Sequence, residues 1–339
     1  MILKEAVAYY TSHDSHVYCT FLDATKAFDR IGYAKMFEKL LLRRISPIVI
    51  RFLIQLYVGQ VTRISWDSTL SAVFSVHNGV RQGAISSSIL FCLYIDELLI
   101  RLKNANVGCY VGNTFLGALC YADDLTLLAP TPDAMRKMLE ICNEYAREHN
   151  ISFNASKSKC MLFSPSNKPE CESRYTPTFF INKSPIDYVD SWLHLGNILS
   201  IDQNDSLSIA SRRSHLIGQI NNILCTFGKL SIAVKTDLLY KFCSSFYGSV
   251  LWDLQRPDVQ RICSVWRDAM KRIWRLPRNT HSILINSLTC NLPTFDELCR
   301  RFATFHFKCL SSCNRTVNFI CRHALCNLRA QSPHGRNLL

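Results

Sequence analysis

Three aspartates at two places in the chain are of the right type to bind metal ions. Asp123 and Asp124 are adjacent and lie between two apolar runs, and Asp23 ends the alternating stretch 16–23. Apolar runs on both sides of a short polar pair predict a β-hairpin with the two aspartates at or beside its turn. Because successive strand residues point to opposite faces, both carboxylates cannot face the core, and at least one is exposed at the hairpin tip.

Clustered carboxylates would suit hard divalent cations such as Mg²⁺, which leave coordination positions for phosphate and water. Without a cation, the three negative charges would repel one another. The alternatives are structural, with Asp123 and Asp124 in an ordinary turn and Asp23 as the N-cap of the next helix. The stretch after Asp23 lacks the alternating oxygen ligands and central Gly of an EF-hand loop.

Short strands and amphipathic helices surround these aspartates. Strands are predicted at 16–23, at 60–66 and 71–77, on both sides of the aspartate pair, and at 178–199. Helices are predicted before residue 16, at 33–44, at 47–58, from a serine cluster to about 101, and at 133–149. The loop that precedes the serine cluster holds Gly79 and Gly83, and glycine lets the backbone approach a ligand closely.

The second part of the chain is basic. Residues 201–339 contain 19 Lys and Arg against 8 Asp and Glu, whereas residues 1–200 contain 20 against 18. This excess favours a phosphate-backbone partner, the alternative being a solvated helical surface. Helices are predicted here from about 203 and at 230–249, 257–275 and 294–312.

Composition argues against several other classes of protein. Hydrophobic residues make up 48% of the 339 residues, enough for a sizeable core. The apolar run 89–100 is interrupted by Asp96 and Glu97, so no membrane span is expected. Sixteen cysteines without a signal-peptide pattern indicate reduced thiols in an intracellular protein of the nucleus or cytoplasm.

Taken in order, these motifs resemble the palm of a reverse transcriptase, specifically that of non-LTR (LINE-type) retrotransposons. The stretch from Asp23 resembles motif A, and the hairpin with Asp123 and Asp124 completes the acidic set. The resemblance implies two Mg²⁺ (or Mn²⁺) ions held by these aspartates. It also places Phe28 at the bulky gate that excludes a 2′-hydroxyl, with core packing as the alternative, and Tyr121 in substrate binding.

Further positions match the family outside the acidic motifs. Gln82 and Gly83 occupy the motif B positions that touch the template and nascent base pair, although Ser-Ser-Ile at 87–89 replaces the common Ser-Pro-Leu. Lys157 aligns with the motif D lysine near the leaving pyrophosphate, the alternative being a solvated lysine.

The resemblance continues into a primer grip and a thumb. Leu195 and Gly196 end a stretch that resembles motif E, the primer grip. In a helical basic thumb, Arg212 and Arg213 are expected to contact phosphates of a duplex or an RNA–DNA hybrid without sequence preference.

The fold implied by the resemblance is α+β. A polymerase palm, an antiparallel sheet with packed helices, is expected at 1–200, an all-helical thumb at 201–285 and a cysteine-rich helical tail at 286–339. The implied activity is that of an RNA-directed DNA polymerase, with an RNA template, a DNA primer and dNTPs as partners. The family's fingers and endonuclease precede motif A, and their absence here predicts an N-terminal truncation.

Two other functions stay open. One is a catalytically silent retroelement remnant that at most binds nucleic acid. The other is a viral-type RNA-dependent RNA polymerase, although Phe28 at the sugar gate and Tyr121-Ala122 before the aspartate pair argue against it.

The cysteine-rich tail raises the question of a zinc knuckle. Its candidate ligands are Cys309, Cys313, Cys321, His323 and Cys326. Their spacing fits no compact four-ligand pattern, and several lie at helical, core-like spacing, so zinc is not expected.

Overall fold

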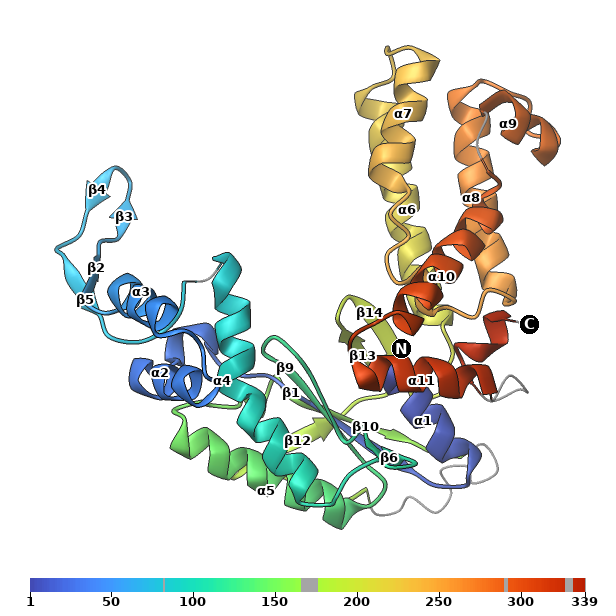
Figure 1. The fold of residues 1–339 in the computed structure, drawn as a ribbon. Helices are drawn as coiled ribbons and strands as arrows, with labels where there is room; N and C mark the ends of the chain where they lie inside the picture. Colours follow the sequence, from blue (N-terminus) through green and yellow to red (C-terminus); the bar gives the residue numbers. More distant parts are fainter. Residues whose placement is uncertain (82, 166–175, 290–291, 327–331, 339) are drawn as a thin grey trace. The chain divides into compact units, whose positions relative to one another are not determined.

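The computed structural model describes residues 1–339 except 82, 166–175, 290–291, 327–331 and 339. The described residues form two compact units (Figure 1). His13–Val189 make up the first, the sheet unit, and Met1–Ser12 together with Asp190–Leu339 make up the second, the helical unit. The functional divisions expected at 200/201 and 285/286 stay predictions.

A six-stranded sheet forms the centre of the sheet unit. Its strands, in spatial order, are β11 (Phe179–Ile181), β12 (Ser184–Tyr188), β10 (Lys159–Phe163), β1 (Val17–Leu22), β9 (Asp124–Ala129) and β8 (Ala118–Tyr121). Neighbouring strands are antiparallel except β10 and β12. The expected antiparallel sheet is therefore confirmed apart from this pair, which can run parallel because the 20 residues between β10 and β12, 164–183, include β11 and are long enough for a crossover.

The two central strands are apolar because both of their faces are covered. Every residue of β9 after Asp124 is buried, and β1 is buried except for Tyr18. Helices α4 (Ile85–Asn104) and α5 (Pro132–Glu148) pack together (Figure 1), and α5 contacts β9 and β11. The sheet thus holds the start of β9 and the end of β1 in a fixed register.

Smaller elements complete the sheet unit. They are the 3₁₀ turn η1 (Phe28–Arg30), helices α2 (Tyr33–Leu42) and α3 (Pro47–Tyr57), and the paired strands β2 (Gln60–Thr62) with β5 (Phe74–Val76), β3 (Ser65–Trp66) with β4 (Thr69–Leu70), and β6 (Tyr110–Val111) with β7 (Thr114–Phe115). The two predicted helices and the predicted strand pair around Asp67-Ser68 are confirmed. Both turn residues have positive φ, which suits a two-residue hairpin turn.

The helical unit has its own core, with Trp252, Trp266 and Leu298 among its buried residues. Its elements are α1 (Ile2–Ser12), the hairpin β13 (Ser191–His194) with β14 (Asn197–Ser200), α6 (Ser206–Thr226), α7 (Ile232–Cys243), η3 (Ser249–Leu251), α8 (Pro257–Ile273), α9 (Ser282–Thr289), α10 (Thr294–Leu310), α11 (Arg315–Cys326) and η4 (Gly335–Leu338). The helices predicted at 257–275 and 294–312 are confirmed.

One predicted helix is shorter than expected. The helix predicted at 230–249 ends at Cys243, because Phe246 and Gly248 adopt positive φ values of 39° and 84° that an α-helix cannot accommodate. Among the described helices, none combines the length and the apolar character needed to cross a membrane.

Candidate active site

The pairing of β1 with β9 brings the two acidic stretches together. Leu22 pairs with Leu125 in an antiparallel register, so the next residues, Asp23 and Asp124, face each other at the ends of adjacent strands. Opposed residues of antiparallel strands have their Cα atoms about 4.5–5.5 Å apart. Two aspartates that are 101 positions apart in the sequence therefore become neighbours.

The second acidic stretch forms the predicted hairpin. Tyr121 pairs with Asp124, which leaves Ala122 and Asp123 as the two turn residues, and Ala122 has a positive φ of 52°. The Cys120 thiol donates to the Ala122 carbonyl over 3.2 Å and holds the turn from inside. Asp123 is half-buried in the turn and Asp124 is exposed at the start of β9, so the expected display of a carboxylate at the tip is confirmed.

The electrostatics of this site reflect the crowding of negative charge. Partial burial raises the pKa of Asp124, and the charges of Asp123 and then Asp23 raise it further. Burial, together with Cys92 and then the two hairpin aspartates, also raises the pKa of the neighbouring Cys120 to about 12. The three carboxylates thus lie close enough to disfavour one another's ionised form, a state that a bound cation would relieve.

A loop after α5 fixes the main chain of Asp23. The Asp23 N–H donates to Ser158 Oγ over 3.1 Å, and the Asp23 carbonyl accepts from the Asn154 N–H over 2.9 Å. Ser158 is fully buried, and its hydroxyl donates to the Asn154 carbonyl over 2.7 Å. Sequence reasoning missed the role of Ser158. The only signal for it was its place beside Lys157 in the stretch that resembles motif D.

Lys157 lies in the same loop. Its backbone N–H donates to Asn154 Oδ1 over 3.3 Å, and its side chain is exposed. Because Asn154 and Ser158 both bond the main chain of Asp23, the structure brings the loop that carries Lys157 to the end of β1.

Phe28 lies where the segment after β1 meets the loop before α4. Its carbonyl accepts from the Val80 N–H over 2.8 Å, and the half-buried ring lies 5.2 Å from the Phe91 ring, between centroids. Gly79 has a φ of +89°, and an added Cβ would stand 2.8 Å from the Asp29 carbonyl oxygen. Only glycine allows this close approach of the two backbones.

The remaining sheet-unit candidates border this region. Gly83 has a φ of +88°, but among the described residues beyond its chain neighbours, none has a heavy atom within 4 Å of the position its Cβ would take. Gln82 lies outside the described residues. The buried Ser87 hydroxyl donates to the Arg81 carbonyl over 2.6 Å and closes the loop onto α4. Tyr121 is 68% exposed at the end of β8.

In the helical unit, Leu195 and Gly196 form the turn of the β13–β14 hairpin, with φ values of 46° and 73°. Arg212 donates to the Gly196 carbonyl over 2.6 Å, and its guanidinium lies 5.1 Å from the centre of the Tyr247 ring. The Tyr247 hydroxyl donates to the Leu195 carbonyl over 2.9 Å. Leu195, Gly196 and Arg212, three of the residues predicted to contact nucleic acid, therefore lie together. The fourth, Arg213, is an exposed residue of α6.

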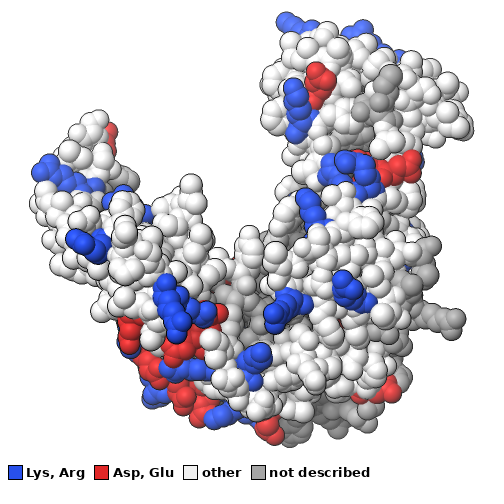
Figure 2. Space-filling view, in the orientation of Figure 1, with Lys and Arg blue, Asp and Glu red and all other residues white. Residues whose placement is uncertain are grey.

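Surface charge is distributed differently over the two units. Figure 2 shows Lys and Arg intermingled with Asp and Glu around α4 and α5, in keeping with ion pairs such as Arg101–Glu148 and Arg136–Asp133. On the visible face of the helical unit, Lys and Arg side chains are scattered with few acidic neighbours (Figure 2). This pattern agrees with the excess of positive charge counted in residues 201–339.

Comparison with known proteins gives a consistent set of relatives. The family model for reverse transcriptase (RNA-dependent DNA polymerase) matches residues 2–197. The Retrovirus-related Pol polyprotein from type-2 retrotransposable element R2DM of Drosophila melanogaster is 29% identical over 187 residues, covering 54% of this chain and 18% of that protein. A probable RNA-directed DNA polymerase from transposon X-element of the same species is 23% identical over 327 residues, covering 92% and 34%.

The aligned part is about a third or less of the length of these two relatives. Among solved structures, apo telomerase from Candida tropicalis aligns with a TM-score of 0.48 at 12% identity, over 99% of this chain and 54% of its own.

Proposed function

Since this chain belongs to the reverse transcriptase (RNA-dependent DNA polymerase) family, we propose that it carries the polymerase site of a non-LTR retrotransposon protein. The reaction is the addition of dNTPs to the 3′-hydroxyl of a DNA primer on an RNA template. The observation that carries the proposal is the opposition of Asp23 and Asp124 at the ends of β1 and β9, with Asp123 beside them in the turn.

The donor set fits a pair of Mg²⁺ or Mn²⁺ ions. Asp23, Asp123 and Asp124 offer carboxylate oxygens, the ligands that hard cations prefer. The pKa of Asp124 is raised by partial burial and then by the charges of Asp123 and Asp23, and bound cations would offset this repulsion. When bound, two such ions activate the primer hydroxyl and stabilise the charge on the leaving pyrophosphate. The buried hydroxyl of Ser158 acts as a positioning group by holding the main chain of Asp23.

The neighbouring residues select and orient the nucleotide. The Phe28 ring, backed by Phe91, lies under the sugar and leaves no room for a 2′-hydroxyl. Gly83, together with Gln82, offers its backbone to the template and the nascent base pair, because no described residue beyond its chain neighbours contacts the position of its Cβ. Tyr121 contacts the substrate from the exposed end of β8, and Lys157 acts at the leaving pyrophosphate.

The helical unit binds the nucleic acid. The Leu195–Gly196 turn contacts the primer backbone, and Arg212 supports that turn from α6. Arg213 and other cations of residues 201–339 contact phosphates, because this part holds 19 Lys and Arg against 8 Asp and Glu. Contacts of this kind are independent of base sequence.

A second candidate is a catalytically silent retroelement remnant that only binds nucleic acid. The basic helical unit would serve either function, but the register that places Asp23 opposite Asp124, with Asp123 beside them, favours the polymerase.

Primer extension separates the candidates. The chain is incubated with Mg²⁺, a DNA primer annealed to RNA, and either dNTPs or rNTPs. Extension with dNTPs is the expected result. Extension in the rNTP reaction but not in the dNTP reaction would indicate an RNA polymerase. Tight binding of the hybrid without extension in either reaction would favour the silent remnant.

A further inference from the structure

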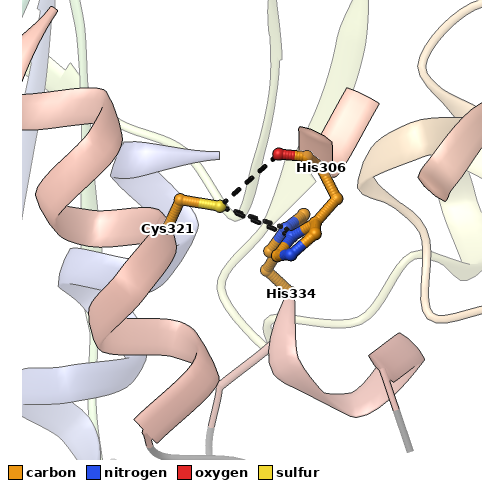
Figure 3. A group of neighbouring side chains, drawn as sticks. All are labelled: His306, Cys321 and His334. Atoms are coloured by element: carbon orange, nitrogen blue, oxygen red, sulfur yellow. Dashed lines mark hydrogen bonds between the residues drawn. The ribbon is translucent and has the colours of Figure 1, made fainter. Parts of the chain in front are cut away.

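Three potential metal ligands come together in the helical unit, outside the polymerase site. His306 belongs to α10, Cys321 to α11, and His334 immediately precedes η4 (Figure 3). All three are buried, with exposed fractions of 5%, 0% and 5%. Their ligand atoms all lie within 4.8 Å of one another.

The separations between these atoms match a tetrahedral zinc site. His306 Nδ1 lies 2.9 Å from His334 Nε2, and Cys321 Sγ lies 3.4 Å and 4.0 Å from these two nitrogens. With Zn–N bonds of about 2.05 Å and a Zn–S bond of about 2.3 Å, tetrahedral geometry requires about 3.3 Å between nitrogens and about 3.6 Å from sulfur to nitrogen. A change of a few tenths of an ångström in each side chain is sufficient.

A buried carboxylate lies next to the cluster. Glu5 of α1 is 6% exposed, and its Oε1 accepts from the backbone N–H of His334 over 2.6 Å. Zinc with two neutral imidazoles and one thiolate carries a net positive charge, which the Glu5 carboxylate would offset. The same carboxylate also has hydrogen bonds from the His334 N–H and the Ser332 hydroxyl, and the N-terminal amine and Arg336 lie near it, so it accommodates the ion without requiring it.

We propose that His306, Cys321 and His334 bind one zinc ion, with water in the fourth position. Binding releases the thiol proton of Cys321 to solvent, since the thiolate is the ligand. The ion ties α10, α11 and the segment before η4 together.

This ligand set differs from the one suggested by the sequence. The expectation against zinc rested on the spacing of Cys309, Cys313, Cys321, His323 and Cys326. Of these only Cys321 belongs to the cluster, and Cys313 and Cys326 are exposed. The two histidine ligands lie 15 positions before and 13 positions after Cys321.

The competing interpretation is a metal-free core in which the two imidazoles share a hydrogen bond and Cys321 is a small buried side chain. Elemental analysis of the purified full chain distinguishes the two. We expect about one zinc per chain, in line with a three-residue protein site, and its loss in Cys321→Ala. The matched control is Cys326→Ala, which removes an exposed thiol from the same helix and retains the metal. Wild-type protein without zinc after purification and after addition of one equivalent would overturn the proposal, as would equal loss in both variants.

A variant that fails to fold does not decide the matter, so the wild-type chain is also loaded with Co²⁺. Visible d–d bands of a tetrahedral ion, with a thiolate-to-cobalt charge-transfer band in the near ultraviolet, are expected, and Cys326→Ala should leave both unchanged. His334→Gln, judged folded by circular dichroism, is expected to weaken Co²⁺ binding by about 10- to 100-fold or more. An octahedral spectrum, or one without the charge-transfer band, contradicts this ligand set.

Discussion

Asp124 begins a strand directly across from Asp23, and its pKa is raised by burial and by two neighbouring aspartates. A folded state that holds a proton more tightly than the unfolded chain loses stability as the pH rises through the range in which the group ionises. Above the folded-state pKa, the loss remains at its full value. The metal-free protein is therefore less stable at neutral pH than a variant without this charge.

The first prediction is that Asp124→Asn raises the Tm of the chelator-treated protein at pH 7. We expect about 1–2 °C, a fraction of a kcal/mol, because solvent screens this exposed group. The gain should shrink as the pH falls toward the range in which Asp124 is protonated, and Mg²⁺ should stabilise the wild type more than the variant. Asp133→Asn, an exposed aspartate of α5, is the control. Equal Tm values for wild type and Asp124→Asn at every pH would argue against the charge cluster.

The second prediction concerns Phe28 and the discrimination between dNTPs and rNTPs. Phe28→Val should raise rNTP relative to dNTP incorporation by about 10- to 100-fold, since a smaller side chain admits the 2′-hydroxyl. The half-buried ring also packs on Phe91, so we expect a loss of about 1–2 kcal/mol in stability, less than for a fully buried ring.

The control for this loss of packing is Phe37→Val, which removes another half-buried ring, one that packs on Tyr33. It should reduce stability without changing sugar selection. An unchanged nucleotide ratio in an active Phe28→Val protein would make Phe28 a core residue only.

At the scale of elements, the loop between Gly79 and Ser87 offers a matched pair of glycines. Gly79→Ala forces a Cβ onto the Asp29 backbone and should cost about 2–5 kcal/mol by overpacking and strain. Gly83→Ala meets no neighbour and should cost only about 1 kcal/mol of backbone strain. If Gly83 faces the template and nascent base pair, its variant nonetheless weakens nucleotide or template binding. Urea unfolding together with KM for dNTP separates the two effects, and an unaltered KM in Gly83→Ala would remove Gly83 from the site.

The hairpin β13–β14 and helix α6 allow two arginines to be distinguished. Arg213→Ala should lower the slope of log K against log salt by about 0.9 for hybrid binding by the full chain, weakening all sequences alike. Arg212→Ala should in addition increase hydrogen exchange at the Leu195–Gly196 turn, because its guanidinium bonds the Gly196 carbonyl. Fluorescence anisotropy over a salt series gives the slope. An unchanged slope in Arg213→Ala would mean that Arg213 contacts no phosphate and is only a solvated side chain on the surface of α6.

Local sequence patterns predicted most helices and strands. The contacts that they did not predict depend on the pairing of segments far apart in the sequence. The aspartate hairpin follows from apolar runs around Asp123-Asp124, a signal contained within a dozen residues. The bond from Asp23 to Ser158 depends on the register of β1 with β10, which no local pattern encodes. Arg212 was predicted to contact phosphate from its charge alone, while its bond to the Gly196 carbonyl depends on how α6 packs against the hairpin.

At the scale of the whole molecule, each unit has its own hydrophobic core and its own chemical character. The sheet unit gathers the three aspartates, whereas residues 201–339 carry most of the positive charge. Chemistry and nucleic-acid affinity should therefore respond to separate substitutions. A change in the aspartates should leave hybrid binding intact while strongly lowering the rate of catalysis.

The most direct test is the rate of single-nucleotide addition by the full chain on an RNA template, measured for wild type, Asp123→Asn and Asp133→Asn under saturating dNTP and Mg²⁺. Asp123→Asn is isosteric and lies in the turn of the hairpin, outside the hydrophobic core, so its circular dichroism and hybrid affinity should match the wild type. We predict that its rate falls by about 100- to 1,000-fold, as when a single group that stabilises the transition state is removed. Asp133→Asn should retain the wild-type rate. Addition by Asp123→Asn at more than about a tenth of the wild-type rate, against that expected loss, would contradict the assignment of the catalytic site to this hairpin.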